Sequence, residues 1–134
     1  SQLKKINMFL KRRYVIANYY KTYFLKNKKK LNFEINGNMN IKSSSNHLFI
    51  IKIHLNKIKK TRAQIMLELR SKGIFTQVHY IPVPYHPYYS KKNKFSNIKN
   101  ASRYYESCLS IPIYFSLTDK DQKYVIKQLI NIIK

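Results

Sequence analysis

Residues 78–89, Val-His-Tyr-Ile-Pro-Val-Pro-Tyr-His-Pro-Tyr-Tyr, contain the side chains of this chain best suited to binding a ligand. Two histidines and four tyrosines stand beside three of the four prolines. Imidazole and phenol groups donate and accept hydrogen bonds, and proline fixes φ, so a loop of this composition holds polar groups at fixed positions. The segment is therefore either a ligand-binding edge or a proline-stiffened cover over hydrophobic core, with His79 hydrogen-bonded internally.

The remaining residues do not indicate other site chemistry. Gly37 and Gly73 are accounted for by a turn and a helix end, which leaves no glycine-rich phosphate loop. No Cys/His grouping has metal-ligand spacing, and the five Asp and Glu residues show no paired-carboxylate pattern. Cys108, beside two tyrosines in a predicted helix, is interpreted as a core residue. We therefore predict no catalytic residue and no metal site in this chain.

The elements that position this segment follow from apolar periodicity and from end signals. Thr118-Asp119-Lys120-Asp121 resembles a capping box, and Gly73 stands where a helix C′ residue belongs. We predict helices over 2–24, 61–72 and 97–109 and from Thr118 onward, strands over 48–55 and 74–80, a short extended piece over 110–113, and loops over 25–46 and 80–89. The 80–89 loop is expected to be ordered and extended rather than helical. This order predicts an α+β domain with a sheet of two or three strands covered mainly on one face.

Length and composition set the outer limits. The chain has 134 residues, enough for one domain, and 44% of them are hydrophobic, enough for a core. A content of 14% aromatic residues excludes a fully disordered chain. No apolar run approaches the ~18 residues of a membrane span. The single cysteine fits a reducing compartment, so we expect a cytoplasmic location without a membrane partner.

The net charge of +22, from 27 Lys+Arg against 5 Asp+Glu, suggests a nucleic-acid-binding module. Base composition is a competing explanation, because the abundant Lys, Asn, Ile and Tyr share A/T-rich codons. The cations are also spread from Lys4 to Lys134 rather than gathered in one segment. Non-specific, salt-sensitive binding of polyanions is expected from the charge alone.

The proline-rich segment, with its flanking motifs in order, resembles the C-terminal part of sugar aminotransferases of the DegT/DnrJ/EryC1/StrS family. Among these it is most similar to members that act on a UDP-linked 4-keto-6-deoxy sugar in pseudaminic acid biosynthesis. The matching motifs are residues 3–19, 47–49, 69–74, 78–83, 86–89, 104–113 and 117–126. Residues 84–86, Pro-Tyr-His, differ from the polar triplet expected at this point.

The resemblance implies the small C-terminal domain of a fold-type-I, pyridoxal-phosphate-dependent transferase. Residues 1–24 would be the connecting helix and residues 25–134 the small domain, with the large N-terminal domain absent. In the complete family enzyme the large domain supplies the Schiff-base lysine and the acid beside the pyridinium nitrogen, so this chain alone is expected to bind no cofactor. The residues implied to contact the nucleotide sugar are His79, Tyr80, Val83, Pro84, Tyr85 and His86.

We therefore expect a C-terminal fragment of an enzyme that transfers an amino group from glutamate to a nucleotide sugar, inactive by itself. The complete enzyme is expected to be a homodimer, and a separately encoded N-terminal half is an alternative arrangement. Two other classes of function stay open: a basic nucleic-acid-binding module, and an orphaned, non-catalytic interaction domain.

Overall fold

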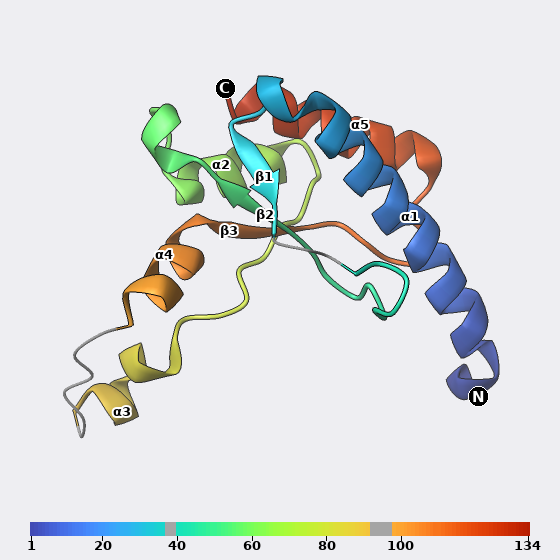
Figure 1. The fold of residues 1–134 in the computed structure, drawn as a ribbon, viewed down its shortest axis with the longest axis horizontal. Helices are drawn as coiled ribbons and strands as arrows, with labels where there is room; N and C mark the ends of the chain where they lie inside the picture. Colours follow the sequence, from blue (N-terminus) through green and yellow to red (C-terminus); the bar gives the residue numbers. More distant parts are fainter. Residues whose placement is uncertain (37–39, 92–97) are drawn as a thin grey trace.

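A computed structural model describes residues 1–36, 40–91 and 98–134 (Figure 1). The helices of this part of the chain are η1 (Gln2–Lys5), α1 (Ile6–Asn27), η2 (Lys28–Lys30), η3 (Leu55–Lys57), α2 (Arg62–Ser71), η4 (Val83–Tyr85), α3 (Pro87–Ser90), α4 (Lys99–Ser107) and α5 (Asp119–Ile132), where η marks a 3₁₀ helix. The strands are β1 (Phe33–Ile35), β2 (Phe49–Ile53) and β3 (Cys108–Ile111). The predicted α+β class is confirmed. None of the described helices is long and apolar enough to cross a membrane.

The described strands form one antiparallel sheet in the order β1-β2-β3. Side chains alternate between the two faces, so the register places Phe49 opposite Ile111 and Ile51 opposite Leu109 on the same face. These four residues are buried and form the centre of the core. The other face carries the half-exposed ion pair between Lys52 and Glu34. The sheet is thus apolar on the face that α1 covers and mixed on the opposite face.

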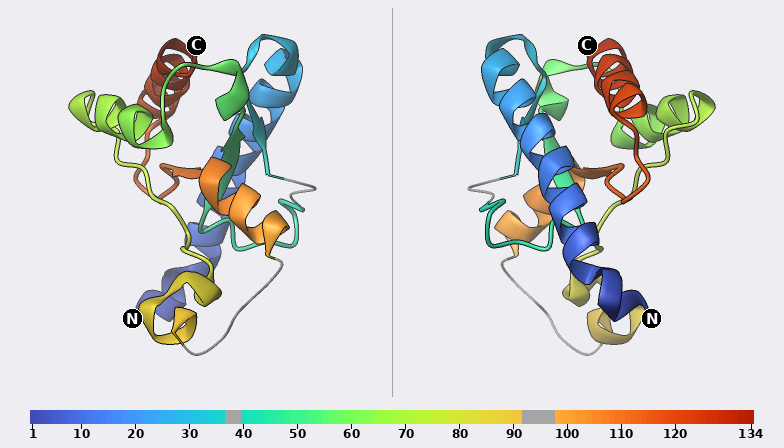
Figure 2. Two further views of the ribbon diagram at one scale, coloured as in Figure 1. Left: turned by 90° about the vertical axis from the view of Figure 1, so that its left-hand side faces the viewer. Right: turned by 90° about the vertical axis from the view of Figure 1, so that its right-hand side faces the viewer.

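Figure 2 shows α1 and α4 on opposite sides of the sheet. The C-terminal half of α1 buries Ala17, Tyr20 and Phe24 in the core, and the rings of Tyr20 and Phe49 lie 5.0 Å apart. Burial raises the pKa of Tyr20, whose hydroxyl donates to the carbonyl of Pro112 at 3.1 Å. The predicted helix over 2–24 is confirmed in type and continues three residues further as α1.

Helix α5 contacts α1 and α2 and begins where the sequence predicts. The Thr118 hydroxyl accepts from the Asp121 N–H at 3.1 Å, while the Asp121 carboxylate accepts from that hydroxyl instead of completing a reciprocal capping box. The Gln122 amide donates to the Ile16 carbonyl at 2.8 Å, and the Arg12 guanidinium contacts the Asp119 carboxylate at 3.0 Å. These two contacts tie α5 to α1.

Helix α2 begins with a complete capping box between Thr61 and Gln64. It ends as predicted at Gly73, whose φ of +74° lies in the left-handed region that glycine adopts without strain. The N–H groups of Gly73 and Ile74 donate to carbonyls of the last turn at 2.9 Å. This end turns the chain sharply toward the predicted site segment.

The prediction of a loop over residues 25–46 is wrong at three places, one of which is the 3₁₀ helix η2 at Lys28–Lys30. Helix α1 extends to Asn27, and β1 forms within the segment because Phe33 and Ile35 alternate with Glu34 and pair with β2. The predicted turn at Asn36-Gly37-Asn38 falls largely outside the described residues.

The predicted strand over residues 74–80 is also wrong. Only Gln77 pairs with β3, through two hydrogen bonds with Ser110. On the N-terminal side of Gln77, the next hydrogen-bonded position of an antiparallel ladder would lie opposite Pro112, which has no N–H to donate. On the other side the Cys108 N–H already caps α4 by donating to the Tyr104 carbonyl. The ladder therefore stops after a single bridge.

The predicted helix over 97–109 is confirmed in type but ends at Ser107, and Asn97 lies outside the described residues. Cys108 and Leu109 belong to β3, where both are buried. The short extended piece predicted over 110–113 thus begins two residues earlier, because pairing with β2 buries these two side chains.

Candidate functional site

The predicted site segment, residues 78–89, begins directly after Gln77, which pairs with Ser110 of β3 at the edge of the sheet. The backbone of Ser110 exchanges two hydrogen bonds with Gln77, at 2.8 and 3.2 Å. Its side-chain oxygen lies 2.9 Å from Nδ1 of His79. Ser110 is buried, with 6% of its surface exposed, so these hydrogen bonds fix His79 to the edge of the sheet. The internal hydrogen bond expected for His79 is thus present.

A small pocket of about 180 Å³ lies beside this anchor. His79, His47 and Ser110 contribute polar atoms to its lining, and Pro112 and Phe75 contribute apolar surface. Nδ1 of His47 lies 3.3 Å from the Ser45 hydroxyl. In residues 1–36, 40–91 and 98–134, no three His, Cys, Asp or Glu side chains gather as a group able to hold a metal ion.

Beyond His79 the loop contains two short helices, η4 and α3, so the prediction of a wholly extended loop is wrong. Pro84 and Pro87 stand in the first turns of these helices, where no intrahelical partner exists for an N–H and the fixed φ suits the helix. The Tyr85 N–H donates to the Pro82 carbonyl at 2.8 Å. Nε2 of His86 lies 3.2 Å from the Ile81 carbonyl oxygen. The prolines thus start helical turns here.

The side chains of this loop point largely to solvent. Tyr80, Val83 and Tyr85 are 75%, 60% and 50% exposed, and no residue from 80 to 90 is buried. The loop therefore does not cover the core of this chain. The rings of His79 and Tyr80 meet edge to face at 4.8 Å, which joins the anchored residue to the first exposed one.

The middle of the loop is held by α4 at Tyr85. The hydroxyls of Tyr85 and Ser102 share a hydrogen bond, and Ser102 in turn donates to the Ile98 carbonyl at 3.1 Å. His79 and Tyr80 thus lie at the sheet end of the loop, while Tyr85 is fixed beside α4. The structure places the six predicted residues on one loop but does not gather them around one cavity.

The junction between α4 and β3 is held by Arg62 of α2. Its guanidinium donates to the carbonyls of Tyr105 and Cys108 and lies over the Tyr105 ring at 4.8 Å from the centroid. Burial raises the pKa of the Cys108 thiol, and the thiol donates weakly to the Tyr105 carbonyl. These contacts fix the start of β3 and, two residues later, Ser110.

Three residues that support the loop are absent from the sequence prediction: Ser110, Ser102 and Arg62. Ser110 has a recognisable signal, because it is the single polar residue in the apolar stretch Leu-Ser-Ile-Pro. Ser102 and Arg62 have none, since both lie in polar helical sequence and act through residues distant in the chain.

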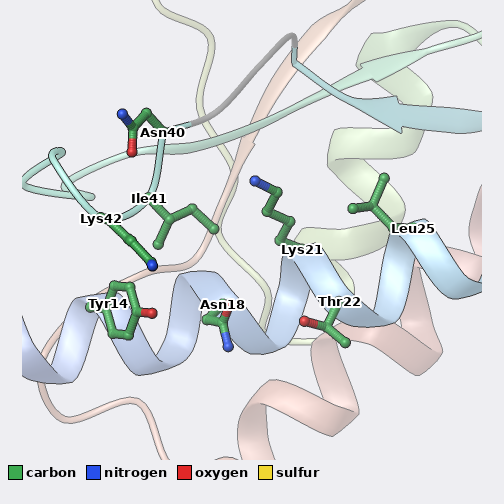
Figure 3. A pocket seen from close by; sticks show the side chains of 8 residues that line it. All are labelled: Tyr14, Asn18, Lys21, Thr22, Leu25, Asn40, Ile41 and Lys42. Atoms are coloured by element: carbon green, nitrogen blue, oxygen red, sulfur yellow. The ribbon is translucent and has the colours of Figure 1, made fainter.

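A separate groove of about 540 Å³ lies between α1 and residues 40–42 (Figure 3). The Lys42 side chain extends from the loop toward α1, and the Lys21 side chain rises from α1 toward the loop (Figure 3). None of the six predicted site residues lines this groove.

Solved structures of sugar aminotransferases share this architecture in their own chains. Helicobacter pylori PseC, an aminotransferase of pseudaminic acid biosynthesis, superposes with a TM-score of 0.84 at 25% identity, covering 99% of this chain and 35% of that chain. The PLP form of Spr1654 from Streptococcus pneumoniae superposes with a TM-score of 0.82 at 24% identity, covering 98% of this chain and 33% of that chain, and supports the fold.

The chain belongs to the DegT/DnrJ/EryC1/StrS aminotransferase family, whose model matches residues 1–130. It is 37% identical over 91 residues to the spore coat polysaccharide biosynthesis protein SpsC of Bacillus subtilis, covering 66% of this chain and 23% of SpsC. It is 32% identical over 134 residues to the UDP-4-amino-4,6-dideoxy-N-acetyl-beta-L-altrosamine transaminase of Campylobacter jejuni, covering 100% of this chain and 35% of that protein. The predicted family is confirmed, and the chain spans about a third or less of these relatives' length.

The family depends on pyridoxal phosphate, so its fit to these residues can be tested. A bound pyridine ring commonly has its nitrogen paired with a carboxylate in an enclosed site. The carboxylates of this chain are engaged or exposed: Glu34 contacts Lys52, Glu68 contacts Lys60, Asp119 contacts Arg12, Asp121 contacts Thr118, and Glu106 is exposed on α4. None of the five fits that role, and we derive no step through the cofactor.

Proposed function

We propose that this chain is the C-terminal portion of a nucleotide-sugar aminotransferase that transfers an amino group from glutamate to a UDP-linked 4-keto-6-deoxy sugar. The proposal is carried by the match over all 134 residues to a transaminase named for a UDP-linked amino sugar. The exposed loop, fixed near its start by Ser110 and at Tyr85 by α4, supports it by offering a pre-organised binding edge.

In this proposal His79 and Tyr80 contact the nucleotide sugar, and Val83, Pro84, Tyr85 and His86 form the adjoining wall. Tyr80 presents an aromatic face and a hydroxyl to solvent, which suits a base or a sugar ring. The His79 ring is held in place because its Nδ1 is hydrogen-bonded to Ser110. Its Nε2 stays available for a ligand.

The proposal assigns residues 1–24 to a helix that connects to a large N-terminal domain and residues 25–134 to the small domain. The exposure of η1, which precedes α1, supports this division, since Leu3 of η1 is 79% exposed while Tyr20 of α1 is fully buried. The lysine and the acid for the cofactor belong to the large domain, and the complete enzyme works as a cytoplasmic homodimer. That domain can precede this chain or be encoded separately.

This chain alone is proposed to be inactive, which its engaged carboxylates support. Incubation with pyridoxal phosphate followed by borohydride should leave no stoichiometric adduct at a single lysine, as mass spectrometry would show. One specific, stoichiometric adduct would contradict the proposal. Scattered, substoichiometric labelling of surface lysines is the expected background.

The nucleotide-sugar contact is tested in a joined protein, made from the part of the Campylobacter jejuni transaminase that this chain does not match, followed by this chain. Tyr80→Ala should raise KM for the UDP-sugar about tenfold and leave kcat within about twofold. The reason is that the lost contact would stabilise the bound substrate and the transition state equally. Tyr89→Ala, outside the six residues, is the matched control. An equal effect of both variants would argue against the assigned wall.

A further inference from the structure

Strand β1 is an edge of the sheet, with an outer side that no described strand pairs with. Its even-numbered neighbours bond to β2: the His54 N–H donates to the Asn32 carbonyl at 2.8 Å, and the Asn36 N–H donates to the Ile50 carbonyl at 3.0 Å. In an antiparallel ladder the intervening residues direct their N–H and C=O groups away from the partner strand. Phe33 and Ile35 therefore present backbone donors and acceptors along the outer edge.

A groove of about 600 Å³ surrounds this edge. Phe24 and Phe33 reach its base from the core, and its accessible apolar surface comes from Leu25, which is 47% exposed, and from the half-buried Ile35. Lys28 and Lys29 of η2, which are exposed, and the half-exposed Lys52 of β2 also line it. The groove adjoins the one between α1 and residues 40–42, because Lys21 and Leu25 line both.

The charge of this groove is strongly positive. Glu34 is the single carboxylate among its lining residues, and the Lys52 amine lies 2.6 Å from it. That hydrogen bond lowers the pKa of Glu34, so the carboxylate is ionised at neutral pH and offsets one lysine. Lys28 and Lys29 remain as positive charge beside the backbone edge, and an anionic partner complements them.

We propose that the outer edge of β1 binds an extended, acidic peptide segment of a partner protein, which adds to the sheet as a further antiparallel strand. The backbone of the segment pairs with the outward groups of Phe33 and Ile35, and its carboxylates face Lys28 and Lys29. Alternate apolar side chains of the segment pack against Leu25 and Ile35. This interaction is independent of the proposed aminotransferase function.

The geometry favours a peptide over a nucleic acid. Strand-directed N–H and C=O groups pair with another strand in register, whereas a nucleic acid would use the lysines and leave these groups unpaired. The edge also lies away from the sugar-binding loop: β1 begins near the C-terminus, while the loop ends in α3 at the opposite end of the molecule (Figure 1). The two surfaces can therefore be occupied together.

The test uses a fluorescein-labelled peptide of alternating Glu and Val, seven residues long, titrated with the full chain and followed by anisotropy. An otherwise identical peptide with alternate backbone nitrogens methylated keeps the charge but loses strand pairing. We expect it to bind at least about tenfold more weakly, because its methylated nitrogens cannot donate hydrogen bonds to the outward carbonyls of β1. Equal binding of the two peptides would overturn the proposal.

Variants locate the interaction. The double variant Lys28→Glu with Lys29→Glu should weaken binding of the peptide at least about tenfold. The control, Lys123→Glu with Lys127→Glu on the exposed side of α5, makes the same charge change elsewhere and should have little effect. Ile35→Pro removes an outward N–H that the β1–β2 ladder does not use and should also weaken binding, with circular dichroism unchanged. Equal losses from both lysine pairs would overturn the assigned groove.

Amide hydrogen exchange gives a readout that does not depend on variants. In the free chain the Ile35 amide should exchange faster than the Glu34 amide, which pairs with β2, and it should become protected when the peptide binds. Protection of Ile35 in the free chain would contradict the open edge. Competition with a single-stranded oligouridylate tests the nucleic-acid alternative. If the oligouridylate displaces the peptide and binds Ile35→Pro as well as the unchanged chain, the groove belongs to nucleic acid and the proposal is overturned.

Discussion

Nδ1 of His79 lies 2.9 Å from the buried hydroxyl oxygen of Ser110. The backbone of the same serine exchanges two hydrogen bonds with Gln77, so one residue of β3 holds the root of the loop by three hydrogen bonds. The loop is therefore positioned by the sheet edge and by α4, even though the ladder beyond Gln77 is not formed. This relationship leads to the first prediction.

Ser110→Ala should lower the free energy of unfolding by about 1 kcal/mol, because it leaves His79 without its buried partner. Urea unfolding followed by circular dichroism measures this. In the joined protein the same change should raise KM for the UDP-sugar. Ser107→Ala, which removes a hydroxyl bonded within α4, is the control. No change in either quantity would show that the hydrogen bond does not position the loop.

Arg62→Lys should loosen the junction between α4 and β3. Lysine cannot reproduce the planar fork that reaches the carbonyls of Tyr105 and Cys108 and lies over the Tyr105 ring. We expect a loss of about 1 kcal/mol in stability and faster amide exchange at Ser110. Arg103→Lys, on the exposed side of α4, should change neither. Unaltered exchange at Ser110 would contradict the role assigned to Arg62.

Gly73→Ala should cost about 1 kcal/mol of stability through backbone strain. The φ of +74° disfavours a Cβ, whereas the added atom would meet nothing within 4 Å, so the cost comes from the backbone and not from a clash. Gly73→Asn should cost less, because asparagine tolerates this region, as Asn46 does here at a φ of +49°. Thermal unfolding compares the variants, and equal costs for Ala and Asn would refute the strain argument.

The Cys108 thiol should react slowly with iodoacetamide in the folded chain and rapidly in urea, because burial excludes the reagent and raises the pKa of the thiol. Above the ordinary thiol pKa, Cys108 keeps its proton in the folded state and loses it in the unfolded state. Stability from this group is thus fully present below that ordinary value and declines as the pH rises above it.

Cys108→Ala should remove this alkaline decline, so the difference in unfolding free energy between the two chains should change with pH above the ordinary thiol pKa and stay constant below it. A difference that is constant over the whole range, or fast labelling of the folded chain, would contradict the assignment.

The sequence predicts well those elements that are specified by local signals. Thr118 caps the start of α5 and Gly73 follows the end of α2, and these capping and left-handed residues fix the two boundaries within a few positions. Strand β2 is found because its five residues are nearly all apolar and β-branched or aromatic. The family resemblance supplied the fold beyond this, and the structural comparison confirms it.

The errors arise where distant partners decide the structure. Strand β1 is too short to show a pattern and forms because β2 pairs with it. Residues 74–80 have the composition of a strand, but Pro112 and the occupied Cys108 N–H end the ladder after Gln77. The anchors Ser102 and Arg62 act over 17 and 43 residues of sequence separation, which no local pattern reports.

The most direct test of the central claim is the rate of amino transfer by the joined protein, with glutamate and a UDP-linked 4-keto-6-deoxy sugar as substrates. The controls are each part alone and the intact Campylobacter jejuni transaminase. We expect the joined protein to form the UDP-linked amino sugar, and each part alone to form none. A folded joined protein that binds pyridoxal phosphate but makes no amino sugar would contradict the claim that this chain completes a nucleotide-sugar aminotransferase.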